Sequence, residues 1–306
     1  MEYHIENLCM NYGRRKALQN FTYTFGTGVY GLIGPNGAGK TTLMQLMAGV
    51  FRPTSGKVFL DGKEFNTMSP AYAAYIGYLP QEIVMYPEFT VRQYLEYVAA
   101  LKKVKSRSAV SACLKLANLE DRAKTRCHKL SGGMKRRLGI AQAVLGDPKV
   151  LILDEPTTGV DITERVRFRQ IISELSANRA VIYSTHTSED LELVAKEIIL
   201  MKEGQIIAAG SGSSLLAGMN GKVWESRMSQ VDFRRAQQER PDILVANVAL
   251  DGEECVVRIL AREQPYGNAV PAPATYEDLS LYTFTEGFAP PAGPGGAARG
   301  EGYPAE

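Results

Sequence analysis

The chain of 306 residues contains few cysteines, and their spacing argues against the common forms of cysteine chemistry. None of the four belongs to a C-x-x-C pair, the spacing that marks many zinc sites and redox-active disulfides. A metal or disulfide interpretation is therefore weak, and we expect four reduced, partly buried thiols. They are Cys9, Cys113, Cys127 and Cys255.

The sequence also lacks a long apolar run, since no stretch approaches the roughly 18 residues that a membrane-spanning helix needs. The N-terminal sequence MEYHIENLCM carries acids where a secretion signal would require a basic end followed by apolar residues. We therefore expect the chain to stay in the cytoplasm. The formal net charge of only +2 argues neither for nor against a nucleic-acid partner.

Patterns of buried strands and amphipathic helices alternate over the first two thirds of the chain. Helical patterns occupy residues 41–48 and 164–175, and a longer helical stretch extends from about 89 to 146. This alternation predicts an α/β fold with a mostly parallel sheet and a helical insertion. The apolar runs that read as buried strands are VYGLI (29–33), VLILDE (150–155) and AVIYSTH (180–186).

Two further patterns predict β-structure outside the parallel sheet. FTYTF (21–25) alternates like a half-buried strand, and GKVFLDGKEF (56–65) reads as a hairpin that turns at Asp61-Gly62. The composition changes after about residue 218, and residues 219–285 predict a small α+β unit with a final helix capped near Thr275. The remaining residues, 286–306, are rich in Pro, Gly and Ala and are predicted to form a disordered tail.

The strongest motif is GPNGAGKT, Gly34–Thr41, which fits G-x-x-x-x-G-K-[ST] between a predicted buried strand and a helix. Glycines allow backbone N–H groups to wrap around phosphates, which the Lys40 ammonium can also reach. The Thr41 hydroxyl is of the kind that ligates Mg²⁺. The motif therefore predicts a nucleotide site.

VLILDE supplies two acids at the end of a buried strand, Asp154 and Glu155. Successive strand side chains point to opposite faces, so we expect the two carboxylates to perform different tasks. One can hold the shell of a Mg²⁺ ion, and the other can orient and deprotonate the attacking water.

KLSGGMKRR, Lys129–Arg137, is a second motif suited to an anion. A hydroxyl and two glycines directly precede a basic helical pattern, so free backbone N–H groups at the helix start can approach a phosphate. The chain already has a phosphate loop about a hundred residues earlier, which raises the question of which anion the second motif serves. Three other residues, Tyr12, Gln81 and His186, carry little signal when each is taken alone.

Together these motifs complete a family pattern, and the chain resembles the ATP-binding subunit of ABC transporters over about its first 215 residues. The motifs arrive in the family's order: Tyr12, GPNGAGKTT, Gln81, LSGGM, VLILDE, TGVD at Gly159–Asp161, and His186. The resemblance implies a P-loop NTPase core with a mostly parallel sheet, an antiparallel β subdomain and a helical subdomain (residues 1–218). It also implies ATP and Mg²⁺ as cofactors.

The resemblance implies a role for each matching residue. Tyr12 would stack on adenine, Glu155 would be the catalytic base, His186 would contact the γ-phosphate, and Gln81 would touch Mg²⁺ or the lytic water. Mg²⁺ would be held by Thr41, Gln81 and, through water, Asp154. The signature would bind the γ-phosphate of ATP held by a second, facing subunit, with Asp161 in the loop between the two sites. The phosphate-loop residues are Gly34, Pro35, Asn36, Gly37, Ala38, Gly39, Lys40, Thr41 and Thr42, and those toward the facing subunit are Ser131, Gly132, Gly133 and Asp161.

The implied partners are a second ABC ATPase subunit, identical or not, and integral membrane permease subunits, with no nucleic acid. The implied location is peripheral, at the cytoplasmic face of the cell membrane. The stretch after Gln81 and the C-terminal unit are similar to bacterial ABC-2 type exporter ATPases. Three departures from the commoner pattern, Met134, Arg136 and Ile162, remove no group that contacts phosphate or metal.

The main alternative is a soluble ABC-type ATPase with a role in translation or DNA maintenance. DNA-associated relatives insert a long coiled coil between phosphate loop and signature, whereas the segment between Gln81 and Leu130 has room for a few helices only. Translation-factor relatives usually carry two cassettes in one chain, and this sequence has one. Both observations favour a transporter subunit.

Overall fold

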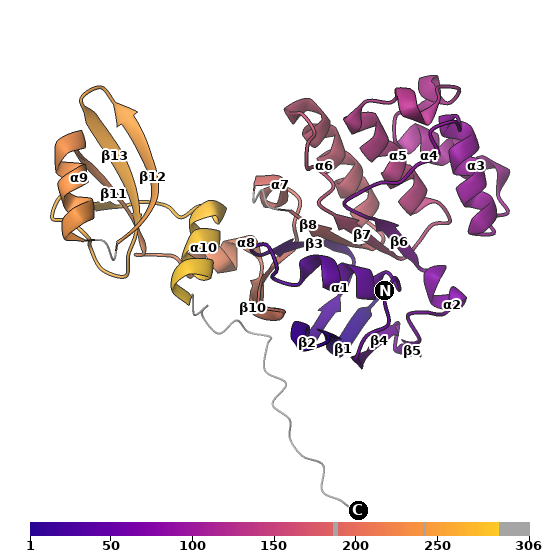
Figure 1. Cartoon of the computed structure of the whole chain (residues 1–306), viewed down its shortest axis with the longest axis horizontal. Coiled ribbons are helices and arrows are strands. Elements are labelled where there is room, and N and C mark those ends of the chain that lie inside the picture. Colours follow the sequence, from indigo (N-terminus) through magenta and orange to yellow (C-terminus); the bar gives the residue numbers. More distant parts are fainter. Residues whose placement is uncertain (186–188, 241–242, 288–306) are drawn as a thin grey trace, which may run out of the picture. The chain divides into compact units, whose positions relative to one another are not determined.

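The computed structural model describes residues 1–185, 189–240 and 243–287, and the contacts divide the chain into two compact units at Ala209/Gly210 (Figure 1). This division precedes the boundary expected at residue 218. The reason is that helix α8 (Gly212–Ala217) packs against α10 (Tyr276–Tyr282) in the second unit. A Cβ atom on Gly212 would lie only 1.7 Å from the Tyr276 hydroxyl, which shows how closely these helices approach.

A six-stranded sheet, ordered β10-β9-β3-β8-β7-β6, forms the centre of the first unit. Strands β9, β3, β8, β7 and β6 pair in parallel, which confirms the predicted mostly parallel sheet. Strands β7 and β8 are buried along their whole length, as their continuous apolar sequences predict. The strands are β3 (Gly28–Ile33), β6 (Ile76–Leu79), β7 (Val150–Asp154), β8 (Ala180–Ser184), β9 (Glu197–Lys202) and β10 (Gln205–Gly210).

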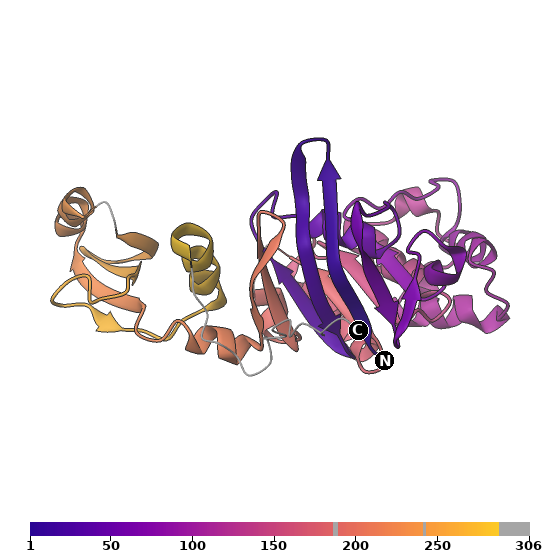
Figure 2. The ribbon, with the colours of Figure 1, turned by 90° about the horizontal axis from the view of Figure 1, so that it is seen from below.

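A second, antiparallel sheet in this unit has the order β2-β1-β4-β5, and Figure 2 shows its long β1–β2 hairpin in indigo. Asp61 and Gly62 connect β4 to β5 with positive φ angles, as a two-residue hairpin turn requires. Helix α1 (Lys40–Met47) packs between the two sheets and contributes four side chains to their shared apolar core. The strands are β1 (Tyr3–Tyr12), β2 (Arg15–Phe25), β4 (Ser55–Leu60) and β5 (Lys63–Phe65).

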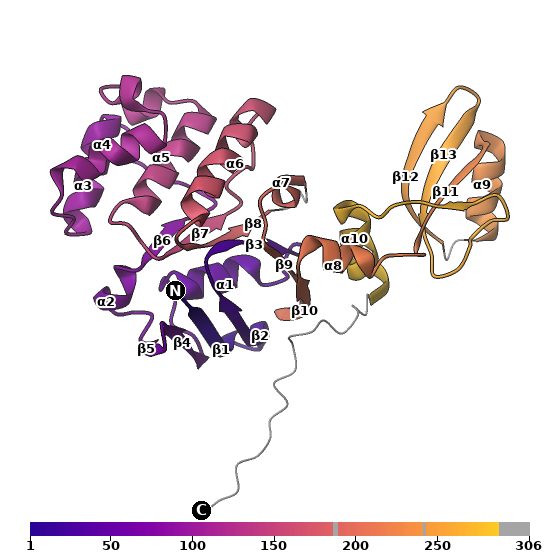
Figure 3. The same cartoon turned by 180° about the vertical axis from the view of Figure 1, so that it is seen from behind.

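The predicted helical insertion forms three helices that pack on one another, α3 (Val91–Leu101), α4 (Arg107–Leu116) and α5 (Gly132–Val144) (Figure 3). Thr90 begins α3 with a capping box, in which its hydroxyl and the Gln93 side chain satisfy each other's backbone N–H groups. Helix α6 (Ile162–Ser176) packs on β3 and β8 of the parallel sheet. Two short helices, α2 (Pro70–Ala73) and α7 (Glu189–Glu192), complete this unit.

The second unit is the small α+β unit expected from the sequence. Its antiparallel sheet has the order β12-β13-β11-β14, and α9 (Gln230–Glu239) packs on β11 and β13. Cys255, Val257 and Ile259 form the buried core. The strands are β11 (Val223–Ser229), β12 (Leu244–Asp251), β13 (Glu254–Leu260) and β14 (Val270–Pro271).

The helices and cysteines of the structure bear on the expectations drawn from what the sequence lacks. Within residues 1–185, 189–240 and 243–287, no helix combines the length and the apolar composition needed to cross a bilayer. All four cysteines are free thiols, and three of them are buried while Cys9 is half-buried. The tail predicted for 286–306 lies outside the described residues from 288 onward.

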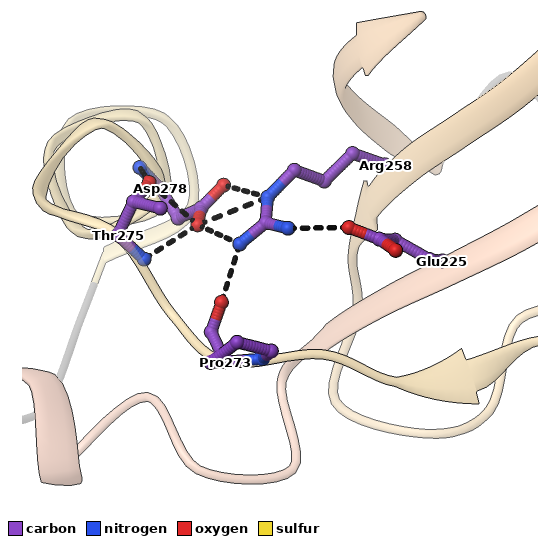
Figure 4. A network of polar contacts seen from close by, with 5 residues as sticks. All are labelled: Glu225, Arg258, Pro273, Thr275 and Asp278. Atoms are coloured by element: carbon purple, nitrogen blue, oxygen red, sulfur yellow. Dashed lines mark hydrogen bonds and ion pairs between the residues drawn. The ribbon is translucent and has the colours of Figure 1, made fainter. Parts of the chain in front are cut away.

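Arg258 ties the sheet of the second unit to the start of α10 (Figure 4). Its guanidinium donates to both carboxylate oxygens of Asp278, to Glu225 and to the carbonyl of Pro273. Asp278 also accepts from the backbone N–H and the hydroxyl of Thr275, the N-cap of α10. Burial alone raises the pKa of Asp278, but the hydrogen bonds from Arg258 and Thr275 outweigh it and hold the pKa below its usual range.

Replacing Asp278 by Asn is expected to destabilise the second unit by about 3 kcal/mol at neutral pH, because it leaves the largely buried Arg258 without its main counter-charge. Since the folded pKa is depressed, this stabilisation is present above the unfolded pKa of about 3.9 and is lost as the pH falls through the folded pKa. Urea unfolding followed by Trp224 fluorescence measures it, because the chain's single tryptophan lies in β11.

The exposed Arg227–Asp251 pair of the same unit offers a matched control. Asp251→Asn should change the free energy of unfolding by less than about 1 kcal/mol, since exposed ion pairs contribute little. Equal effects of the two substitutions would contradict the role assigned to Asp278.

Candidate functional site

The phosphate loop connects β3 to α1 and borders a pocket of about 370 Å³. Gly37 and Gly39 have φ angles of 82° and 99°. Residues that carry a Cβ atom rarely adopt such angles, so glycine is required where the loop turns. Gly34 is restricted for another reason, because a Cβ atom there would lie 2.3 Å from the Met201 carbonyl oxygen. The pocket is lined by Tyr12, Arg15, Ala17, Asn36, Gly37, Ala38, Gly39, Lys40, Thr41, Thr42, Gln81 and Glu155.

Lys40, at the start of α1, is buried and folds back onto its own loop. Its ammonium donates to the carbonyl of Gly34 at 2.6 Å and reaches that of Pro35 at 3.3 Å. Burial lowers the pKa of Lys40, while the charges of Glu155 and Asp154 act in the opposite direction. Gly34 and Pro35 therefore face Lys40 through their carbonyls rather than lining the pocket.

Asp154 is the last residue of β7 and is almost fully buried. Its Oδ1 accepts a hydrogen bond of 2.7 Å from the Ser184 hydroxyl on the neighbouring strand β8. Within the described part of the chain, its buried Oδ2 has no hydrogen-bond partner. Burial raises the pKa of this carboxyl, partly offset by the hydroxyls of Ser184 and Thr41.

Glu155 lies beyond the strand, so the expected alternation of two strand side chains is wrong for this pair. Its φ of 47° is a left-handed conformation, which turns the chain out of the sheet directly after Asp154. Its backbone N–H donates to the Ser184 hydroxyl oxygen at 2.9 Å. The two carboxylates are separated by this backbone turn, and Ser184 contacts both residues.

The Glu155 carboxylate meets Gln81 at the edge of the pocket. Gln81 Nε2 donates to Glu155 Oε2 at 3.1 Å, and the Thr158 hydroxyl donates to the same oxygen at 3.2 Å. Gln81 follows the end of β6 and is exposed, whereas Glu155 is buried except for its pocket side. The structure thus brings Lys40, Gln81 and Glu155 into one pocket, as expected from the motifs.

Tyr12 lies at the end of β1, half-exposed at the rim of the pocket, with its ring edge-on to Phe51. Two other lining residues, Arg15 and Ala17 of β2, were not anticipated from the sequence. The Arg15 guanidinium approaches Gly37, where a Cβ atom would lie 3.6 Å from it. A basic residue three positions after the aromatic was a signal, but without the hairpin its proximity to the loop could not be predicted.

The signature residues Ser131, Gly132 and Gly133 lie outside the phosphate-loop pocket. Ser131 is the N-cap of α5 and accepts from the Met134 backbone N–H at 3.2 Å, while Gly132 and Gly133 form the first turn. Asp161 is the N-cap of α6 and accepts from the Glu164 N–H at 2.9 Å. None of Ser131, Gly132, Gly133 and Asp161 borders the phosphate-loop pocket, which agrees with a signature that serves another subunit's nucleotide. His186 lies outside the described residues, so its contact stays a prediction.

The apolar segment after Gln81 differs in part from the expected contact surface of Ile83, Met85, Tyr86 and Phe89. Ile83, Met85 and Phe89 are half-buried, and Ile83 packs close to Gly139 of α5. The most exposed apolar side chain is instead Val84, at 87%, followed by Tyr86 at 50%. Exposure alternates from Ile83 to Tyr86, because one side of the segment packs against the helical insertion and the other side does not.

Comparisons with known proteins identify the family to which the chain is related. The ABC transporter family profile matches residues 18–158. The chain is 38% identical over 206 residues to YxlF of Bacillus subtilis, described as an uncharacterised ABC transporter ATP-binding protein, covering 66% of this chain and 68% of that one. It is 35% identical to the Nod factor export ATP-binding protein I of Paraburkholderia xenovorans, over 68% and 70% of the two chains.

The fold is similar to that of a solved cassette. The dimeric structure of the bacterial ABC transporter cassette MJ0796 covers 68% of this chain and 98% of its own, with a TM-score of 0.62 and 24% identity. The relatives are transporter proteins, so the alternative of a translation or DNA-associated ATPase is not favoured. The chain belongs to the ATP-binding proteins of ABC transporters, the ATPase subunits of that family.

Proposed function

We propose that the chain binds and hydrolyses Mg-ATP as one of two facing cassettes and so drives export through membrane subunits. The observation that carries the proposal is the pocket in which Lys40, Gln81 and Glu155 converge while the signature stays outside it. Family membership supports ATP as the nucleotide, and dimers of such cassettes support the facing arrangement. Similarity to a Nod factor export ATP-binding protein supports export as the direction of transport.

The phosphate loop would bind ATP by exchanging one set of contacts for another. Lys40 is held inside the loop by the carbonyls of Gly34 and Pro35 and also lines the pocket, so its positive charge lies beside the space that phosphates would fill. Backbone N–H groups at Gly37 and Gly39 and at the start of α1 supply further donors. Arg15 adds a second positive charge near the same loop, and Tyr12 offers an exposed ring at the rim for the base.

The residues around Asp154 fit a magnesium ion. Carboxylate and hydroxyl oxygens are the ligands that Mg²⁺ prefers, and the Asp154 Oδ2, buried without a partner in the described part of the chain, leaves such a ligand available. Thr41, Gln81 and Asp154 would hold the ion, which would neutralise charge that develops on the phosphate oxygens.

Glu155 is positioned to take a proton from the attacking water. Its Oε2 accepts hydrogen bonds from Gln81 and Thr158, which fix the carboxylate at the edge of the pocket. A water held between the Glu155 carboxylate and the γ-phosphate would be deprotonated as its oxygen attacks phosphorus. The signature of the facing subunit would complete this site through Ser131, Gly132 and Gly133.

The membrane partner would dock on the exposed apolar residues after Gln81. Val84 and Tyr86 project from this segment, and Tyr86 forms an aromatic cluster with Phe89 and Tyr97 of α3. Since Gln81 donates a hydrogen bond to the proposed base Glu155, movement of this segment by the membrane partner would shift the Glu155 carboxylate directly. The chain would then act as a peripheral protein at the cytoplasmic face of the membrane.

Replacing Val84 and Tyr86 together by Glu should move the protein from the membrane fraction to the soluble fraction when it is co-expressed with its permease. Two buried charges at an apolar interface cost several kcal/mol, enough to reduce association at least tenfold. ATP binding by the purified subunit should be unchanged. Val231→Glu, at an exposed apolar position of α9, is the control. Retention at the membrane equal to that of the control would refute this docking surface.

A further inference from the structure

Glu164 of α6 links three parts of the first unit. Its backbone N–H donates to Asp161 Oδ1 at 2.9 Å, so the residue belongs to the cap that begins α6. Its carboxylate Oε1 accepts from Arg167 at 2.9 Å, and its Oε2 lies 3.0 Å from Arg137 Nε. The Glu164 side chain is only 16% exposed and Arg137 only 6%, so their ion pair is shielded from water.

The same side chain packs directly against the signature. A Cβ atom on Gly133 would lie 3.2 Å from Glu164 Cδ and 2.9 Å from its Cγ, and the second distance is shorter than real Cβ contacts. Gly133 therefore leaves the space into which the Glu164 side chain fits. The Glu164 side chain thus occupies the space beside Gly133 that a side chain at this position would fill.

Arg137 provides a fixed counter-charge for this carboxylate. It lies one turn into α5, and its Nη1 donates to the carbonyls of Ala117 and Asn118 at 2.9 and 2.7 Å, just after α4. Its Nε–H makes no directed hydrogen bond within the described residues, so the contact with Glu164 is electrostatic. Because Arg137 is anchored by two carbonyls, movement between the helices would be taken up by Glu164.

A short path continues from Glu164 to the catalytic base of the same chain. Asp161 ends the segment that starts at Glu155, and within this segment the Thr158 and Val160 N–H groups bond back to the carbonyls of Glu155 and Thr157. The Thr158 hydroxyl donates to Glu155 Oε2. A shift at the start of α6 is therefore transmitted through a compact turn to the carboxylate.

We propose that Glu164 is a positioning residue that couples the signature to the base Glu155 of its own chain. The inference rests on the proposed function, in which Ser131–Gly133 bind the facing subunit's γ-phosphate. Binding of that phosphate fixes Gly133, Gly133 fixes Glu164, and Glu164 holds the Asp161 turn in the arrangement that orients Glu155. Occupancy of one composite site thus prepares the other.

The test uses Glu164→Gln, which keeps the shape of the side chain and removes its charge. We expect nucleotide binding to the single chain to change little, whereas the melting temperature should fall, because the buried Arg137 loses its counter-charge. ATP-driven dimerisation, measured in the Glu155→Gln background, should weaken about tenfold, and the Hill coefficient of ATP hydrolysis should fall from about 2 toward 1. A merely structural residue would lower stability without changing cooperativity.

Arg167→Gln is the matched control, since it removes the exposed partner of the other Glu164 oxygen and should leave both readouts unchanged. Absence of dimerisation by Glu155→Gln itself would overturn the proposed function. Normal dimerisation and an unchanged Hill coefficient after Glu164→Gln would overturn the coupling alone. If Glu164→Gln fails to fold, Glu164→Asp is tested by the same two readouts. Its shorter carboxylate keeps the charge but withdraws from Gly133 and Arg137, so dimerisation and the Hill coefficient should still fall.

Discussion

Glu155→Gln is expected to lower ATP turnover by roughly a hundredfold or more while ATP still binds. The amide retains an oxygen that can accept from Gln81 and Thr158, so the pocket keeps its shape. It cannot accept the proton of the attacking water, and the reaction loses its base. The left-handed backbone at this position is unchanged, because Gln tolerates it about as well as Glu does.

Since hydrolysis is what would release the facing cassettes, the variant should accumulate as an ATP-bound dimer. Phosphate release measures the turnover, and size-exclusion chromatography in ATP and Mg²⁺ measures the dimer. Glu203→Gln, an exposed carboxylate at the turn between β9 and β10, serves as the control and should hydrolyse ATP normally. Near-normal turnover by Glu155→Gln would mean that another residue is the base. Gln81, which contacts Glu155, would then have no role in positioning the base.

Mixing two inactive variants, Lys40→Ala and Ser131→Ala, is expected to restore hydrolysis. If each ATP is held by Lys40 of one chain and Ser131 of the other, both sites of each mutant homodimer are damaged. In a mixed dimer one site collects both lesions, and the other has an intact Lys40 facing an intact Ser131. With random exchange of subunits, roughly a quarter of all sites become whole, less what is lost because the sites cooperate.

The structure adds a control to this experiment. Ser131 caps α5, so its replacement by Ala also removes a capping bond and destabilises the helix by about 1 kcal/mol. Ser131→Asn preserves a cap but places a bulkier group at the phosphate, and should behave like Ser131→Ala in the mixing test. Mixed dimers that are verified by separate tags and remain inactive would count against a shared site. In a heterodimer of cassettes, the second lesion is placed in the partner's signature.

The features that could be predicted from the sequence are those that depend on local chemistry. The phosphate loop, the acids at the end of β7, the cap near Thr275 and the buried strands each combine residue types whose conformation follows from neighbours in the chain. The structure of such a motif can be predicted from its own residues, because turns, caps and phosphate contacts are made within a few residues.

The features that escaped prediction depend on irregular backbone or on distant partners. Strand β1 was missed because Asn7 has a φ of 48° and the register shifts after Ile5 and again after Leu8, which breaks the alternation of apolar residues. Ser184 gave no signal, although it bonds to both Asp154 and Glu155 from the neighbouring strand. The left-handed turn at Glu155 was likewise hidden, since non-glycine residues rarely adopt it.

The resting position of Lys40 has a consequence for how quickly nucleotide can be captured. With its ammonium hydrogen-bonded to the carbonyls of Gly34 and Pro35, the lysine ties the phosphate loop to the start of α1 before any phosphate arrives. An incoming triphosphate would then replace existing contacts instead of ordering a collapsed loop, and the entropy lost on association would be small. Nucleotide capture would then be governed by diffusion and charge attraction, and the slower step would be the association of the two proposed cassettes.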